Sequence, residues 1–143
     1  MRIGRKHLTL VLWLFALHTF AVGLGLILVP SAWMEYFGLV GYQGRFFQVQ
    51  GGVFHLIMGI FYLTPIWHWG VSRLLVHMFI VVKILATVFL FLYFLLVEPA
   101  IVILLSGVGD GLLALMLWWV FRNCPPGERP GPSETMLSQG VIN

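Results

Sequence analysis

Four long runs of apolar residues divide the chain, and short segments with more polar residues separate them. The runs are Leu8–Pro30, Phe46–Trp67, Leu74–Val97 and Pro99–Phe121. An α-helix of about 20 residues, rising about 1.5 Å per residue, crosses a hydrocarbon core about 30 Å thick. The pattern therefore predicts an all-α protein, a bundle of four transmembrane helices that forms one domain over residues 1–123.

The segments outside the four runs predict two further features. Trp33, Tyr36 and Phe37 follow the first run, and aromatic side chains of this kind collect at membrane surfaces. We expect a short interfacial helix there, between the first and second spans, ended by Gly38. Residues 124–143 are rich in proline and glycine and lack apolar periodicity, so we expect a disordered cytoplasmic tail.

Composition and charge support a membrane protein and give its orientation. Hydrophobic residues make up 60% of the chain and charged residues only 9%, whereas soluble domains are about 25% charged. With the N-terminus inside, the cytoplasmic segments carry six basic residues: Arg2, Arg5, Lys6, Arg73, Arg122 and Arg129. The opposite side carries only Arg45. This positive-inside asymmetry predicts that both termini are cytoplasmic. It leaves no basic face for nucleic acid.

One ionisable side chain lies near the middle of each apolar run: His18, His55, Lys83 and Asp110. Counted from the expected helix ends, all four fall at similar depth, close to the centre of the bilayer. An ionised group at that depth costs several kcal/mol unless it is paired or hydrated. We therefore expect the four side chains to meet in one buried cluster inside the bundle.

The second run carries a stripe of polar and small residues with helical spacing. Its members are Arg45, Gln48, Gly52, His55, Gly59 and Tyr62. Residues three and four apart share a helix face, so we expect this stripe to face the bundle interior. Arg45 and Gln48 precede His55 toward the outer side, where we expect them to line the entrance to the cluster. The alternative for Arg45 is an extension toward lipid headgroups.

Lys83 and Asp110 are the expected direct partners within the cluster. They have opposite charge and lie at similar depth on consecutive antiparallel helices. Gly107 and Gly111, spaced four apart around Asp110, permit a neighbouring helix to come close. Two roles stay open for this pair: a proton-bearing or ligand-binding site, or a structural link that fixes helix order and register.

The two central histidines raise the question of a bound metal or haem. Imidazoles on neighbouring helices can hold a haem from both sides, and Gly25, Gly52 and Gly59 would give it room. His18, His55 and Asp110 are also acceptable metal ligands, but no local ligand spacing accompanies them. We favour hydrogen bonding within the bundle, and we expect neither a metal nor a haem.

Motifs of soluble enzymes are lacking in this sequence. It contains no glycine-rich phosphate loop and no Cys-x-x-Cys pair, since Cys124 is the only cysteine. It also offers no defensible Ser-His-Asp arrangement. Nucleotide chemistry and nucleophilic hydrolysis are therefore disfavoured, and we favour a role other than that of an enzyme.

Three segments give the chain a resemblance to a known group of proteins. Pro30–Leu39, Arg45–Gly52 and Leu105–Gly111 resemble, in order and local composition, the DoxX-like superfamily of small four-helix membrane proteins, including its BphX-like branch. The resemblance implies a bacterial inner-membrane protein that is an accessory to redox or aromatic-degradation enzymes, with a link to quinones. It assigns no catalytic residue.

Three hypotheses for function follow. In the first, the cluster binds a lipophilic carbonyl compound such as a quinone, as an accessory to an oxidoreductase or a degradative pathway. Lys83 and Asp110 carry the proton, His18 and His55 donate hydrogen bonds, and Arg45 and Gln48 line the entrance. In the second, the protein is a small proton-coupled transporter, which requires a homodimer because four helices enclose little volume. In the third, it is a structural subunit or assembly factor and the cluster only holds the helices.

Overall fold

The computed structural model describes residues 4–39, 45–68 and 73–125. These residues form, in order, α1 (Arg5–Leu28), the 3-10 helix η1 (Ser31–Phe37), α2 (Arg45–Trp67), α3 (Arg73–Leu96) and α4 (Ile101–Asn123), with no strand in the described ranges. Each α-helix is long and apolar enough to cross a membrane. The prediction of an all-α protein with four such helices is confirmed. The predicted tail lies, beyond Pro125, outside the described residues.

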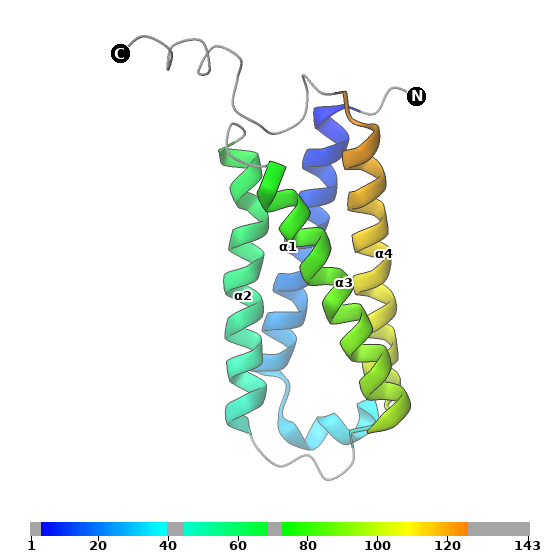
Figure 1. Ribbon diagram of the computed structural model, residues 1–143. Helices are drawn as coiled ribbons and strands as arrows, with labels where there is room; N and C mark the ends of the chain where they lie inside the picture. The colour runs from blue at the N-terminus through cyan, green and yellow to red at the C-terminus, as the bar shows by residue number, and fades with distance from the viewer. Residues whose placement is uncertain (1–3, 40–44, 69–72, 126–143) are drawn as a thin grey trace, which may run out of the picture.

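The helices form two antiparallel pairs. α1 packs along α2, and α3 packs along α4; α1 also contacts α4, whereas α2 and α3 have little contact. α1 begins and α4 ends at the same end of the bundle, and η1 crosses the opposite end (Figure 1). α2 and α3 lie near each other where the chain links them and spread apart toward η1 (Figure 1).

Glycines let the two helices of each pair approach closely. A Cβ atom added at Gly52 of α2 would lie 2.7 Å from the carbonyl oxygen of Gly23 and 2.6 Å from Cγ1 of Ile27, both on α1. The ring of Phe20 covers Gly59 in the same way, with Cε1 at 2.6 Å. The space that Gly52 and Gly59 were expected to give a haem is therefore used for helix packing.

Gly107 and Gly111 of α4 allow the neighbouring helix to come close, as their spacing predicted. An added Cβ at Gly107 would lie 3.3 Å from Cβ of Leu90, and one at Gly111 would lie 3.2 Å from Cγ2 of Thr87. Both neighbours belong to α3. The side of α4 that carries Asp110 is therefore held close to α3, and this position brings the two midspan charges within reach of each other.

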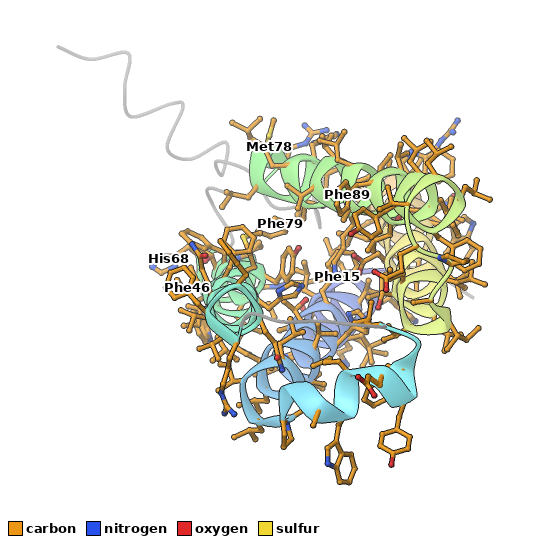
Figure 2. The ribbon with its side chains drawn as sticks, turned by 90° about the horizontal axis from the view of Figure 1, so that it is seen from below. Phe15, Phe46, His68, Met78, Phe79 and Phe89 are labelled. Atoms are coloured by element: carbon orange, nitrogen blue, oxygen red, sulfur yellow. The ribbon has the colours of Figure 1, made fainter. Side chains whose placement is uncertain are left out.

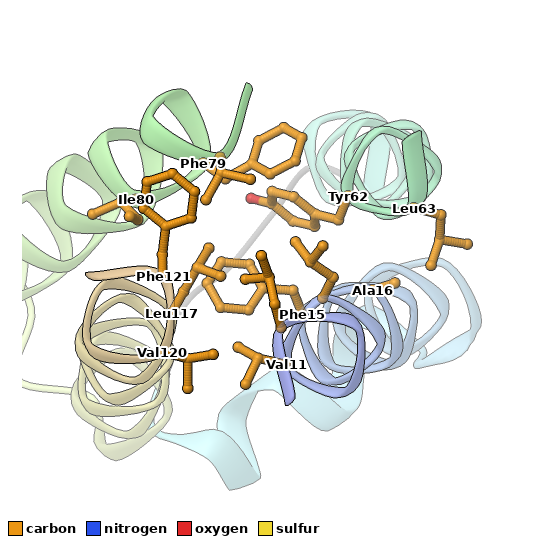
Figure 3. Close-up of a cluster of buried hydrophobic side chains, with 13 residues drawn as sticks. Val11, Phe15, Ala16, Tyr62, Leu63, Phe79, Ile80, Leu117, Val120 and Phe121 are labelled. Carbon is orange, nitrogen blue, oxygen red and sulfur yellow. The ribbon is translucent and has the colours of Figure 1, made fainter. Parts of the chain in front are cut away.

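An apolar core fills the end of the bundle where α1 begins, and all four α-helices contribute to it (Figure 3). The ring of Tyr62 is at its centre, edge-on to Phe15 with centroids 5.2 Å apart and edge-on to Phe79 at 4.8 Å. Aromatic pairs favour such edge-to-face geometry. Leu117 and Val120 of α4 complete the packing, so this end of the bundle is closed.

η1 packs against the other end of the bundle, on the side of α1 and α4 (Figure 2). Its Met34 is buried, whereas Trp33 and Tyr36 are exposed. Gly38 ends the helix with a φ of 87°, a left-handed conformation that favours glycine. A Cβ at this glycine would lie 3.3 Å from Cα of Ala100, just before α4, so η1 is held against the start of that helix. Viewed from this end, η1 lies along one side of the bundle, beside α1, and runs toward α4 (Figure 2).

The close contact between α1 and α2 predicts opposite effects for two adjacent glycines. Gly52→Ala should lower the free energy of unfolding by about 1–3 kcal/mol, because the new methyl group collides with backbone. Gly51→Ala is the matched control: its Cβ would meet only Cδ1 of Leu26, at 3.8 Å, so stability should stay the same or rise slightly. Denaturation in detergent, followed by circular dichroism, measures both. Equal stability of the two variants would contradict the close contact between Gly52 and α1.

Candidate functional site

A single cavity brings together the four midspan ionisable residues, one from each α-helix. It has a volume of about 380 Å³ and is lined by His18, His55, Lys83 and Asp110. The rest of its wall is largely apolar and includes Val22, Leu26, Val29, Leu90, Val102 and Ile103. Small-molecule sites commonly measure about 300–1,000 Å³ and combine apolar walls with a few polar groups. The cavity fits that description.

The ion pair between Lys83 and Asp110 is the most deeply buried part of this cluster. Nζ of Lys83 donates a hydrogen bond to Oδ1 of Asp110, and the two residues are only 4% and 8% exposed. The predicted pairing is confirmed. Either charge alone would be expensive at this depth, and the pairing offsets that cost. One helical turn further along, the Thr87 hydroxyl donates to the carbonyl oxygen of Lys83 at 2.8 Å.

His18 lies beside this pair and lines the same cavity. Its Nδ1 is 3.9 Å from the same Oδ1 of Asp110, too far for a hydrogen bond, and that nitrogen has no partner among the described residues. The His18 side chain is 34% exposed, against 6% for Lys83 and 12% for Asp110. A molecule in the cavity therefore finds more exposed surface on His18 than on the ion pair.

His55 faces the cavity from α2 with one ring nitrogen already committed. Its Nδ1 lies 2.7 Å from the carbonyl oxygen of Gly51. A carbonyl oxygen only accepts hydrogen bonds, so Nδ1 carries the proton and Nε2 is the acceptor in the neutral ring. The backbone of α2 thereby fixes both the orientation and the tautomer of His55.

Tyr62 is a neighbour of the charged pair that the sequence analysis placed on the inner stripe but not in the site. Nζ of Lys83 lies 5.8 Å from the centre of its ring, within the range of a cation–π interaction. The Tyr62 ring forms part of the apolar core, so it separates the charged pair from that end of the bundle (Figure 3). The sequence feature that could have identified Tyr62 as a neighbour of the site is its position on the stripe, two helical turns after His55.

Arg45 and Gln48 differ from the prediction, because the cavity wall includes neither of them. Gln48 is buried, and its Nε2 donates to the carbonyl oxygens of Leu26 at 2.8 Å and Val29 at 2.7 Å. These carbonyls lie at the end of α1, where helical partners run out, so Gln48 caps that helix. Arg45 is exposed, and it borders a separate surface groove with Phe46.

The described parts of the chain, the cavity included, bring together no set of metal ligands. No group of three or more His, Cys, Asp or Glu side chains within residues 4–39, 45–68 and 73–125 is placed to hold a metal ion. At the cavity itself, the chemistry on offer is the donation and acceptance of hydrogen bonds and the holding of a proton.

Comparison of the chain with protein-family models, with curated proteins and with solved structures gave no match. The resemblance to the DoxX-like superfamily therefore stays a prediction. The case for function rests on the residues that line the cavity and on their charges.

The ion pair predicts strongly non-additive effects on stability. Lys83→Met or Asp110→Leu alone leaves one buried charge unpaired and should lower the free energy of unfolding by about 3–5 kcal/mol. The double variant removes both charges and should lie within about 1 kcal/mol of the wild type. A double-mutant cycle, measured by denaturant titration in micelles, gives the coupling energy. Two single variants that fold as stably as the wild type would argue against the pair.

Proposed function

We propose that this protein binds a small lipophilic molecule with a carbonyl-bearing head, such as a quinone, at the centre of the membrane. One observation carries the proposal: each of the four membrane-spanning helices contributes its midspan ionisable residue to the wall of a single cavity that is otherwise apolar. An apolar wall suits a molecule that dissolves in lipid. The polar groups at one side suit a head that accepts hydrogen bonds.

The polar side chains have distinct roles in this proposal. The ammonium of Lys83 has three N–H donors, of which Asp110 takes one. The His18 side chain lines the cavity and is 34% exposed, and a carbonyl oxygen of the ligand accepts a hydrogen bond from this ring. Lys83 and Asp110 hold their proton as a coupled pair in the same wall. The site thus keeps a proton next to the ligand without exposing a charge to lipid.

A purely structural role accounts for less of the arrangement. A link between α3 and α4 needs only Lys83 and Asp110. It gives no reason for His18 and His55 to face the same cavity from α1 and α2. A proton-coupled transporter would use the same pair, but the apolar core around Tyr62 and Phe79 closes one end of the bundle and favours a binding site over a conduit.

We also propose the orientation that the charges predict. Arg5, Arg73 and Arg122 belong to the first turn of α1, the first turn of α3 and the last turn of α4, which share one end of the bundle, and that end faces the cytoplasm. η1 then lies at the outer surface, where exposed Trp33 and Tyr36 suit the headgroup region. The resemblance to the DoxX-like superfamily adds a bacterial inner membrane and a role as an accessory to an oxidoreductase.

Binding of a decyl-substituted benzoquinone tests the proposal. The wild-type protein in lipid nanodiscs should bind the probe saturably, and the Lys83→Met, Asp110→Leu double variant should bind it at least about tenfold more weakly, because its donors and its proton are gone. Lys6→Met removes a lysine from the exposed start of α1 and is the matched control. Quenching of tryptophan fluorescence measures the affinity. If the double variant and the wild type bind the probe with equal affinity, the Lys83–Asp110 pair has only a structural role.

His18 should contribute to affinity without contributing much to stability. His18→Phe keeps a ring of similar size and removes both nitrogens, so affinity for the probe should fall about tenfold, the equivalent of one hydrogen bond of about 1.4 kcal/mol. Arg45→Gln should leave affinity unchanged, since Arg45 lies outside the cavity wall. The same quenching titration reports both. A loss with Arg45→Gln and none with His18→Phe would place the ligand elsewhere.

A further inference from the structure

Two sides of the cavity are closed by tightly packed helix pairs, and on a third side α1 contacts α4. Between α1 and α2, Gly23 and Gly52 bring the two backbones into contact. Between α3 and α4, Leu90 lies against Gly107. Between α1 and α4, Gly109 accommodates the His18 ring, since an added Cβ would lie 3.4 Å from its Nε2. These contacts hold the helices closer together on these sides than between α2 and α3.

Apolar residues stand at both ends of the cavity. The apolar core packed around Tyr62 fills the end where α1 begins. At the other end, Met34, Phe37 and Leu39 form the cavity wall, and the contact between Gly38 and Ala100 holds this segment against α4. A ligand that approached from water would meet apolar side chains at either end.

The remaining side lies between α2 and α3. These two helices have little contact, and the ring of Tyr62 meets the ring of Phe79 near the ends that the chain links. Toward η1 they spread apart, as the side view and the view from the η1 end both show (Figures 1 and 2). The cavity borders on both helices in this region, through His55 of α2 and through Lys83 and Leu90 of α3.

We infer that the cavity opens sideways into the bilayer between α2 and α3, and that its ligand has a long flexible apolar tail that passes through this opening into lipid. This inference rests on the proposed function and adds the ligand class: an amphiphile with an isoprenoid or alkyl chain attached to a carbonyl-bearing head. The head lies next to His18 and the Lys83–Asp110 pair.

The size and chemistry of the cavity support a tail that stays outside. A volume of about 380 Å³ is near the lower end of the range of about 300–1,000 Å³ for small-molecule sites, so it suits a head group better than a head with a long chain. The outward faces of α2 and α3 are apolar, with Phe54 60% and Phe89 61% exposed. An apolar chain that leaves the cavity therefore meets apolar surface and lipid throughout its length.

Photolabelling locates the tail directly. The probe is a benzoquinone whose alkyl tail carries a diazirine near its middle, and it is bound to the full chain in lipid nanodiscs. After irradiation, fragmentation mass spectrometry assigns the labelled residues. We expect labelling on α2 and α3 that an excess of unlabelled decyl-benzoquinone suppresses, and that falls about tenfold in the Lys83→Met, Asp110→Leu variant. The control is the same diazirine chain without the quinone head, which should label every lipid-facing helix and resist competition.

The outcomes separate this inference from the proposed function. Competable labelling confined to α2 and α3 supports both. Competable labelling on Met34 or Phe37 of η1, or on α4, would place the tail elsewhere; it would overturn the sideways opening and leave quinone binding intact. Labelling that no excess of unlabelled quinone suppresses would overturn the binding site and, with it, this inference.

Discussion

The ion pair between Lys83 and Asp110 is the constraint on which the rest of this molecule depends. Each charge removed from water costs several kcal/mol, and only a close, well-directed partner offsets that cost. The pair therefore fixes how α3 and α4 lie against each other, and Gly107 and Gly111 remove the side chains that would keep them apart. The polar side of the cavity forms where this pair meets His18 from α1 and His55 from α2.

The position of the pair gives the cavity two chemically different parts. On one side lie a buried ion pair and the partly exposed ring of His18; the remaining wall is apolar. A strongly polar ligand would gain little binding free energy from such a wall. A lipid-soluble ligand gains from the apolar wall along its apolar part and from the polar side chains at its head. The looser contact between α2 and α3 is consistent with this division, because tight packing on that side would seal the cavity from the bilayer.

The sequence predicted those features that depend on position along one helix. The lengths of the apolar runs predicted the bounds of the four helices to within three residues at each end. The ionisable residues near the middle of the runs, at similar depth, predicted the Lys83–Asp110 pair. It did not predict features that depend on how helices approach each other. Gln48 caps α1 instead of facing a ligand, because the end of α1 lies beside the first turns of α2. Likewise Phe20 fills the space at Gly59, which spacing alone leaves open.

Solid-state NMR of the protein in lipid bilayers tests the central claim most directly. Asp110 is the only aspartate and Lys83 is one of two lysines, so labelling Asp Cγ with ¹³C and Lys Nζ with ¹⁵N isolates this contact. We predict strong dipolar dephasing between the two nuclei, as a direct hydrogen bond requires, and its disappearance in Lys83→Met but not in Lys6→Met. Absence of dephasing in the wild type would show that the two charges do not meet, and the site described above would not exist.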